Sequence, residues 1–471
     1  MSEITLLSAV ELAQQIREKK ISSRELVDAH LARISELNHK LNAFVQVDEG
    51  CARTQARERD EALARGGNVG ALHGVPISLK SSIEVAGFRC EAGTKLRKGM
   101  VATGDAPLVS RLRDTGAVIL GTTNTPELLM AWETDNLLYG RTNNPWDITR
   151  TAGGSSGGEA AAIASGCSAG GVGSDGGGSV RVPAHFCGIC GLKPTPGRIP
   201  STGHFPTSVG PFALLGVVGP MARTMGDLKI LFEVMQGADY GDTSSAPVPV
   251  RWPSRQELKK LRIGYFEDEG RTPVTSETRS AVRTAAEAVG RAGFDVRPFR
   301  PDGLEHARQL WWKFFGVAGA MLLGPMTQGH ETELSPILKE FSGWVAKETP
   351  HTAQTLLDTW IERDVLRAKI FEQMREYPVL ISPVASIPAF RHGERSWTID
   401  GKTVDYLNAW SYCEWFNLLG MPAAVVPVGK SSAGLPIGVQ ISARPWEEEV
   451  VLSVGELLEN EIGTALRHRA H

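Results

Sequence analysis

The N-terminal part of the chain has the hydrophobic spacing of amphipathic helices. Ser22 is followed three residues later by Glu25, a pair that forms a capping box at the start of a helix. Apolar residues then recur at helical intervals: Val27, Leu31, Ile34 and Leu37. The pattern predicts helices over residues 8 to about 66, which pack by one face on the body of the protein.

After Leu72 the pattern changes to short β-branched runs, separated by helical stretches and glycine-rich loops. The runs Val75–Leu79 and Val118–Leu120 predict buried strands. Strands that alternate with helices are typical of an α/β layer structure. Because glycine-rich loops let backbone amides approach a ligand, we expect the chemistry within a core of about residues 70–230.

The C-terminal half predicts further strands and a helical region rich in aromatic residues. A polar, proline-rich stretch over residues 237–253 is typical of a surface connection, and residues 304–376 have helical patterns. Three late apolar runs predict strands that return to the core: Val379–Ile381, Ala423–Val428 and Val439–Ile441. We therefore expect a single domain over residues 1–471, closed by strands within about residues 377–460.

Charge and composition argue against several classes of partner. The formal net charge is only −3, so we expect no basic surface for nucleic acid or an anionic membrane. No run of about 18 apolar residues predicts a membrane span, and Met1–Leu6 lacks the basic and apolar pattern of a secretion signal. We expect a cytoplasmic protein, a monomer or homodimer, that acts on a small molecule.

The six cysteines predict neither a disulfide framework nor a metal site. They are few and scattered along 471 residues, which suits a reducing compartment. Cys187 and Cys190 form a C-x-x-C pair, but a zinc site needs a second pair, which the sequence lacks. His73, His185 and His204 are interpreted as structural. We expect no metal and no cofactor.

Two familiar glycine motifs occur in contexts that do not fit them. Gly171–Gly176 satisfies G-x-G-x-x-G, but it runs into further glycines instead of opening a helix. Gly154–Gly158 satisfies the G-x-S-x-G elbow centred on Ser156, but the polar segment from Asp147 before it does not predict the required strand. An alternative is that the glycine- and serine-rich clusters of this region are only flexible turns. That interpretation would explain one cluster, but it explains poorly why the sequence has three dense ones.

Three segments together resemble the signature region of the amidase signature family. They are Gly153–Gly158, Gly173–Arg181 and Phe186–Thr195. Gly74–Lys80 resembles the family's lysine segment, and Asn417–Pro422 and Gly434–Gln440 resemble its closing strands. The resemblance covers roughly residues 10–460 and is weakest between about residues 240 and 375. It implies an α/β amidase signature fold, with a large twisted mixed sheet covered by helices on both faces.

The resemblance implies a catalytic triad of Lys80, Ser155 and Ser179, with a cis peptide at Ser155. Ser179 is the implied nucleophile, and a serine hydroxyl attacks an acyl carbon only when a neighbour takes its proton. Ser155 can pass that proton on because a hydroxyl both donates and accepts. Lys80 can be the final base only when neutral, so its pKa must fall far below the usual value of about 10.4. Its place after an apolar run predicts burial, which lowers this pKa.

The glycines before Ser179 are implied to stabilise the charge that develops during acyl transfer. Consecutive glycines expose backbone N–H groups without obstruction by side chains. By resemblance, the oxyanion hole takes the amides of Gly176, Gly177, Gly178 and Ser179. The implied supporting residues are Ser156, Asp175 and Arg181. We expect the last two to brace the loop through hydrogen bonds or a salt bridge, with an ordinary surface pair as the alternative.

The aromatic helices fall where the family's substrate region varies. We expect an apolar funnel for an acyl or aryl group, with core packing of the same side chains as the alternative. The candidate lining residues are Leu129, Trp311, Trp312, Phe315 and Trp344. Because no charged clamp is apparent, the resemblance favours aryl or short acyl amides as substrates, with esters and carbamates as further candidates.

Two departures from the family pattern affect this interpretation. Many relatives carry Lys-Asp-Asn where this chain has Lys80, Ser81 and Ser82, so one charge near the lysine is missing. The tRNA-dependent amidotransferase subunits usually carry the segment Ser-Leu-Asp before a Gly-Pro pair. In this chain, residues 213–218 precede the Gly-Pro pair and contain no Ser-Leu-Asp segment. The main prediction is an amide hydrolase. The alternatives are an amidotransferase subunit that needs a partner chain and a non-catalytic scaffold.

Overall fold

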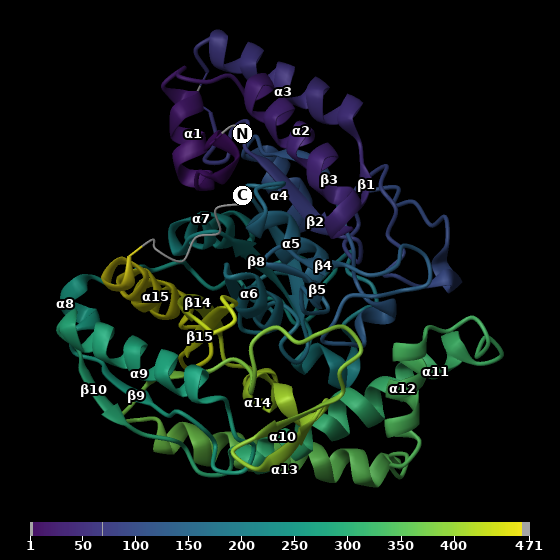
Figure 1. Ribbon diagram of the computed structural model, residues 1–471, viewed down its shortest axis with the longest axis vertical. Helices are drawn as coiled ribbons and strands as arrows, with labels where there is room; N and C mark the ends of the chain where they lie inside the picture. The colour runs from purple at the N-terminus through teal and green to yellow at the C-terminus, as the bar shows by residue number, and fades with distance from the viewer. Residues whose placement is uncertain (1–2, 68, 464–471) are drawn as a thin grey trace.

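One large mixed sheet forms the centre of the protein, whose computed structural model describes residues 3–67 and 69–463 (Figure 1). The sheet has eleven strands in the order β1-β3-β2-β6-β8-β7-β14-β15-β11-β9-β10. The strands are β1 (Phe44–Val47), β2 (Pro76–Lys80), β3 (Val118–Thr123), β6 (Gly170–Asp175), β7 (Cys190–Lys193), β8 (Val217–Ala222), β9 (Arg262–Tyr265), β10 (Asp295–Pro298), β11 (Val379–Pro383), β14 (Ala423–Lys430) and β15 (Pro436–Ser442). The predicted α/β fold with a mixed sheet is confirmed.

Helices cover both faces of this sheet. They are α1 (Ala9–Arg17), α2 (Ser23–Leu41), α3 (Glu49–Ala64), α4 (Pro107–Asp114), α5 (Gly157–Ala164), α6 (Arg181–Cys187), α7 (Met225–Met235), α8 (Arg255–Leu258), α9 (Ser276–Arg291), α10 (Leu304–Trp312), α11 (Gly319–Thr327), α12 (Pro336–Val345), α13 (Ala353–Gln373), α14 (Ser411–Leu419) and α15 (Glu448–Ile462). One buried cluster joins the sheet to α4, α7, α9 and α15, and a second joins it to α5, α6, α10 and α14.

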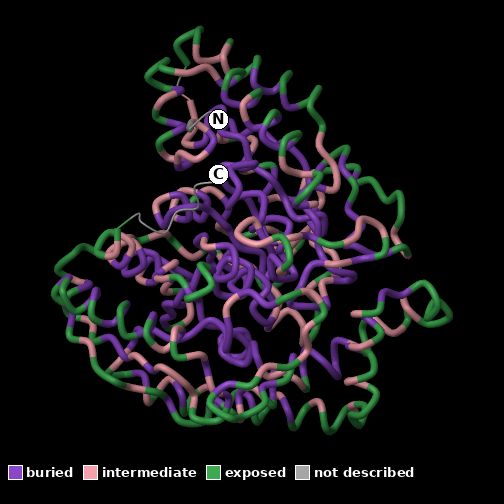
Figure 2. The backbone as a smooth tube through the Cα atoms, in the orientation of Figure 1, coloured by how far each residue is buried: buried purple, intermediate pink, exposed green. Residues whose placement is uncertain are grey.

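The central strands bury both of their faces, as their continuous apolar runs predict. In β11, Val379 and Ile381 belong to one buried cluster, and Leu380 between them belongs to the other. Successive side chains of a strand point to opposite faces, so such a strand must be apolar at every position. Figure 2 shows the result, with buried residues concentrated through the centre and exposed residues along the outer helices.

The N-terminal helices begin as predicted, but one short strand interrupts them. Ser22 accepts the Glu25 amide at 3.1 Å, and the Glu25 carboxylate accepts the Ser22 amide at 2.8 Å, which confirms the capping box. Asn42, in the left-handed conformation with φ of 50°, ends α2. The chain then forms β1 (Phe44–Val47), antiparallel to β3. A four-residue strand at the edge of a sheet is too short for its own periodicity to reveal it.

Two further local expectations were wrong. Asp147–Thr151 forms a strand, β5, which pairs with β4 (Asn143–Asn144) in a separate two-stranded sheet. It therefore precedes Ser155 without joining the central sheet. Residues 411–419 form helix α14, so the segment beginning at Asn417 ends a helix, and the closing strands are β14 and β15. A second small sheet pairs β12 (Ser396–Ile399) with β13 (Lys402–Asp405).

The aromatic region is helical, as predicted, and packs on one side of the sheet. In Figure 1, helices α10 and α13 lie along the lower edge and α11 and α12 lie at the right, and α10 packs against α14. A π-helical turn at Lys313–Ala318 joins α10 to α11. Among the described residues, no helix combines the length and the apolar character needed to cross a lipid bilayer. Met1 and Ser2, which belong to the segment considered as a secretion signal, lie outside the described residues.

The core that supports the sheet predicts a strong effect of truncating a buried leucine of α7. Leu231 is fully buried, and its Cδ1 lies 3.2 Å from the position that a Cβ on Gly170 of β6 would occupy. Leu231→Ala should lower the free energy of unfolding by about 2–5 kcal/mol through lost apolar burial and a cavity. Urea unfolding measures the change. The control is Leu357→Ala on the exposed side of α13, expected to change stability by less than about 0.5 kcal/mol; equal losses would contradict the prediction.

Candidate active site

The candidate active site lies at one edge of the sheet, where two neighbouring strands end. β2 ends at Lys80 and β6 ends at Asp175, and the two strands are parallel. Their carboxyl ends therefore lie at the same edge, which is where open α/β sheets bind ligands. The glycine-rich segment that contains Ser179 follows directly after β6.

Lys80 and Ser155 are in direct contact. The fully buried Lys80 Nζ is hydrogen-bonded to Ser155 Oγ at 2.6 Å and to Ser174 Oγ at 3.0 Å. Ser155 lies just before α5, and its peptide bond with Gly154 is cis. Two of the three residues of the implied triad are therefore adjacent in space although 75 positions separate them in sequence.

Burial changes the acid–base behaviour of this lysine. Desolvation lowers the pKa of Lys80 to about 7, although the carboxylates of Asp175 and Glu159 oppose the shift. An ammonium group is costly in an apolar interior, so the neutral amine is favoured. At neutral pH a large fraction of Lys80 is therefore able to accept a proton.

Ser179 is presented to a cavity, and its backbone is tied to the Ser155 loop. The Ser179 carbonyl accepts the amide of Ser156 at 3.1 Å. Ser156 Oγ also accepts the amide of Ser174 at 3.2 Å, so Ser156 links both loops. Within the described chain, the Ser179 hydroxyl has no hydrogen-bond partner. It is therefore free to meet a ligand in the cavity that Ser155 also lines.

Two adjoining cavities meet at Ser179. The smaller has a volume of about 230 Å³, part of it open to solvent. Its lining is predominantly apolar: Leu129, Met130, Ala131, Trp132, Gly177, Ser179, Phe315 and Phe341. The larger encloses about 400 Å³, and its more polar lining includes Ser155, Ser174, His204 and Ser208. Because Ser179, Leu129, Met130 and Phe315 line both spaces, Ser179 stands where an apolar arm joins a more polar one.

Side-chain donors hold three successive carbonyl groups of the loop before Ser179. The Asp175 carbonyl accepts Asn417 Nδ2 at 3.1 Å, the Gly176 carbonyl accepts Trp311 Nε1 at 2.8 Å and the Gly177 carbonyl accepts Trp132 Nε1 at 2.8 Å. In a trans peptide the N–H group points away from the carbonyl. The three donors therefore fix the directions of the amides that follow each carbonyl.

Those amides differ in their availability. The Gly178 amide donates to Asp175 Oδ1 at 2.7 Å, so it is occupied and we leave Gly178 out of the candidate oxyanion hole. In the described part of the chain, the amides of Gly177 and Ser179 have no acceptor. A Cβ on Gly177 would lie 2.4 Å from the Trp311 ring, which explains why this position requires glycine.

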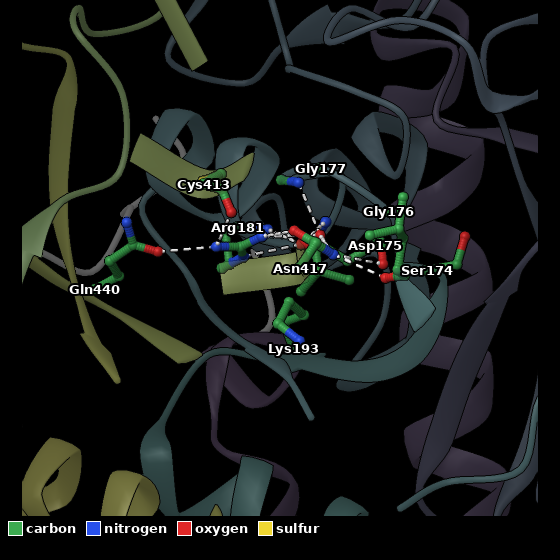
Figure 3. Close-up of polar contacts among 12 residues, drawn as sticks. Ser174, Asp175, Gly176, Gly177, Arg181, Lys193, Cys413, Asn417 and Gln440 are labelled. Atoms are coloured by element: carbon green, nitrogen blue, oxygen red, sulfur yellow. Dashed lines mark hydrogen bonds and ion pairs between the residues drawn. The ribbon is translucent and has the colours of Figure 1, made fainter. Parts of the chain in front are cut away.

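A buried network below the loop contains Asp175 and Arg181 (Figure 3). Their side chains are fully buried and joined at 3.0 Å, which excludes the alternative of a surface pair. Burial alone would raise the pKa of Asp175, but the Arg181 guanidinium outweighs it and holds that pKa well below its usual range. Arg181 also donates to Gln440 Oε1 and to the Cys413 carbonyl, both at 3.0 Å. The pair therefore ties the loop to β15 and α14.

Only two of the five candidate substrate residues, Leu129 and Phe315, line the cavities at Ser179. Trp311 is buried, donates to the Gly176 carbonyl and is not among the residues that line either cavity. Trp312 instead donates its indole N–H to Glu348 at 2.9 Å, and Trp344 packs against Tyr406 with ring centroids 5.9 Å apart. Helix α10 turns Trp311 and Trp312 in different directions because successive residues of a helix do not share a face.

Sequence reasoning missed several residues of the site. Ser174 bonds to Lys80, and Trp132 and Asn417 hold loop carbonyls, yet no local pattern marked these roles. His204, interpreted as structural, lines the larger cavity. Burial and nearby Lys80 lower the pKa of His204 to about 4, so the ring is neutral at pH 7. The described residues contain no group of three or more His, Cys, Asp or Glu side chains placed to hold a metal.

Known proteins resemble this chain along most of its length. The Amidase family model matches residues 25–452. The chain is 33% identical to an indoleacetamide hydrolase of Bradyrhizobium diazoefficiens, over 98% of this chain and 87% of that protein. It is 33% identical to an acylamidase of Rhodococcus erythropolis, over 95% and 93% of the two chains. A bacterial aryl acylamidase of the amidase signature enzymes superposes with a TM-score of 0.83 at 26% identity, over 98% of this chain and 97% of that one.

The contact between Trp311 and Gly176 predicts an effect on the reactivity of Ser179. Trp311→Phe keeps a ring that can stack on Phe315 but removes the N–H donor that orients the Gly177 amide. Covalent labelling of Ser179 by a fluorophosphonate should become about tenfold slower, because the amide donors are no longer held in place. The matched control is Trp312→Phe, whose indole bonds to Glu348 instead. Equal labelling rates in both variants and the wild type would contradict this role.

Proposed function

This chain belongs to the amidase signature family and is an amide hydrolase, and we propose that Ser179 is its nucleophile, activated by Lys80 through Ser155. The observation that carries the proposal is the bond of 2.6 Å between Ser155 and the buried Lys80, whose pKa is lowered to about 7, beside the cavity that presents Ser179. A neutral lysine within reach of a serine relay is the arrangement that serine activation requires.

The proposed first step forms an acyl-enzyme. Ser179 Oγ bonds to the amide carbon as its proton passes to Ser155 Oγ, and the Ser155 proton passes to Lys80 Nζ. The carbonyl oxygen becomes an oxyanion, and the amides of Gly177 and Ser179, with that of Gly176, are its proposed donors. When the C–N bond breaks, the proton on Lys80 returns through Ser155 to the departing nitrogen, which leaves as a neutral amine or ammonia.

The second proposed step releases the acid. A water molecule attacks the ester carbon of the acyl-enzyme and gives its proton to the same relay. Collapse of the tetrahedral intermediate breaks the bond to Ser179 Oγ, which recovers a proton from Ser155. The relay ends the cycle as it began, so the hydrolysis consumes only water.

We infer that the favoured substrates are aryl or short acyl amides, with esters and carbamates as further candidates. The apolar arm at Ser179 has no charged side chain in its lining, and Trp132, Phe315 and Phe341 offer flat apolar surfaces. Such a space suits an aromatic or short aliphatic acyl group. An indoleacetamide hydrolase and an acylamidase among the relatives support this choice.

The proposal includes a cytoplasmic enzyme that works as a monomer or homodimer. All six cysteines are free thiols and five of them are buried, which suits a reducing compartment. The formal net charge of −3 gives no support for a nucleic-acid partner.

Removal of the Ser179 hydroxyl tests the nucleophile. Ser179→Ala should lower kcat/KM for a p-nitroanilide by at least about a thousandfold, because the acyl-enzyme cannot form. Ser110→Ala, at an exposed serine of α4, is the control and should keep the wild-type rate. Wild-type turnover by Ser179→Ala would refute the mechanism. A wild-type chain that is inactive alone but active with a second chain would instead favour the amidotransferase interpretation.

The lysine predicts how activity depends on pH. Protonation of Lys80 removes the base, and its pKa is about 7, so kcat/KM should fall about tenfold per pH unit below pH 7 and level off above it. Lys80→Ala should lose amide turnover more than ester turnover, because an amine leaving group also needs a proton. Exposed Lys402→Ala is the control. The same acidic limb in Lys80→Ala would assign it to another group, such as the buried Lys193, whose pKa is also lowered to about 7.

A further inference from the structure

A buried carboxyl group lies near the proposed base, and the steps above do not use it. Glu159 lies in the first turn of α5, four residues after Ser155, and its side chain is fully buried. Thr123 Oγ1 donates to one carboxyl oxygen at 2.8 Å, and Ser78 Oγ donates to the other at 2.5 Å. Both oxygens are therefore held by hydroxyl groups of the central sheet.

Three neighbouring strands accommodate this carboxyl. Ser78 precedes Lys80 by two residues on β2, so the two side chains share a face of the strand. Thr123 of β3 is the register partner of Lys80. On β6, a Cβ at Gly171 would lie 1.9 Å from Glu159 Oε1, so a larger residue would leave no room for the carboxyl. The sheet is therefore built around Glu159 on the side from which Lys80 projects.

Asp175 and Glu159 are the negative groups that raise the pKa of Lys80, and Asp175 has the larger effect. Asp175, at the end of β6, is paired with Arg181. His204, on the loop that lines the cavity, is neutral at pH 7. Ser155 and Ser174 contact Lys80 Nζ but carry no charge. Glu159 has no arginine partner among the described residues. Burial raises its pKa to about 7, while the hydroxyls of Ser78 and Thr123 and the charge of Lys80 favour its ionised form.

We propose that Glu159 is a positioning residue for the base: its carboxylate stabilises the ammonium that forms when Lys80 takes the proton of Ser179 through Ser155. This inference rests on the proposed function. A buried carboxylate acts in the same way on the imidazolium of a Ser-His-Asp triad, although there it touches the base directly. The role also fits the departure at Ser81 and Ser82, because Glu159 brings from α5 a charge that Lys-Asp-Asn would place next to the lysine.

The sign of the effect follows from the charge. Above about pH 7, where Glu159 is ionised, its charge raises the pKa of Lys80 against the larger lowering effect of burial. Removal of that charge should lower the pKa of Lys80 further and make it a weaker base. The acidic limb of kcat/KM should therefore move to lower pH, and the plateau should fall.

Glu159→Gln tests the proposal because glutamine keeps the shape of the side chain and its hydrogen bonds. Its amide oxygen can accept one hydroxyl, and its NH₂ group can donate to the other. We expect the acidic limb to move down by about one pH unit and the plateau to fall about three- to tenfold. Exposed Glu287→Gln on α9 is the control and should leave the profile unchanged. If the Glu159→Gln enzyme folds and keeps the wild-type acidic limb of kcat/KM, Glu159 only connects the strands through hydrogen bonds. That result would overturn the proposal.

Thr123→Val gives a second test that leaves the carboxyl in place. It removes a donor that favours the ionised form of Glu159, so the limb should move in the same direction by a smaller amount. If Glu159→Gln does not fold, an unmoved limb in Thr123→Val would overturn the proposal. Ser179→Ala, measured in parallel, separates the two levels. If Ser179→Ala is inactive and the acidic limb of kcat/KM is unmoved in Glu159→Gln, only the inference about Glu159 is refuted. If Ser179→Ala is active, the proposed function itself is refuted.

Discussion

The bond between Lys80 and Ser155 depends on keeping an amine fully buried. Water would favour the charged form of the lysine, so the helices on both faces of the sheet must keep water away from Lys80, which is bonded to Ser155 at the side of the Ser179 cavity. The polar partners at this depth are hydroxyl groups, which bond to a neutral amine without stabilising the ammonium as a carboxylate in contact would. The surroundings of Lys80 therefore favour a neutral amine over an ion pair.

The second requirement is a loop whose amides point toward a ligand. A glycine-rich segment has many accessible conformations, and holding it in one has a large entropic cost. Trp132, Trp311 and Asn417 hold three successive carbonyls, and Asp175 takes the Gly178 amide. Contacts within the protein have thus ordered the loop before any ligand arrives, so substrate binding does not have to supply that free energy.

Much of this arrangement could be predicted from the sequence, because β3 and β11 contain apolar runs, β2 is mostly apolar and the signature segments are local patterns. The family resemblance of those segments implied Lys80, Ser155 and Ser179 as candidates, and the structure brings them to one edge of the sheet. The residues that hold the loop could not be found in this way. Trp132 reaches Gly177 over 45 positions, Trp311 reaches Gly176 over 135 and Asn417 reaches Asp175 over 242. No spacing rule connects residues so far apart in the sequence. The positions of tryptophans in the sequence also do not show whether an indole ring only packs in the core or donates its N–H group to a carbonyl.

Because two cavities meet at Ser179, the acyl group, the departing amine and water can occupy different parts of the site. An acyl group seated in the apolar arm would close that side while the ester bond to Ser179 lasts. The second nucleophile would then have to enter by the more polar arm, along the surface that the departing amine has just left. Water and a small amine would compete there for the same ester, so the width and polarity of this passage would set the balance between hydrolysis and acyl transfer.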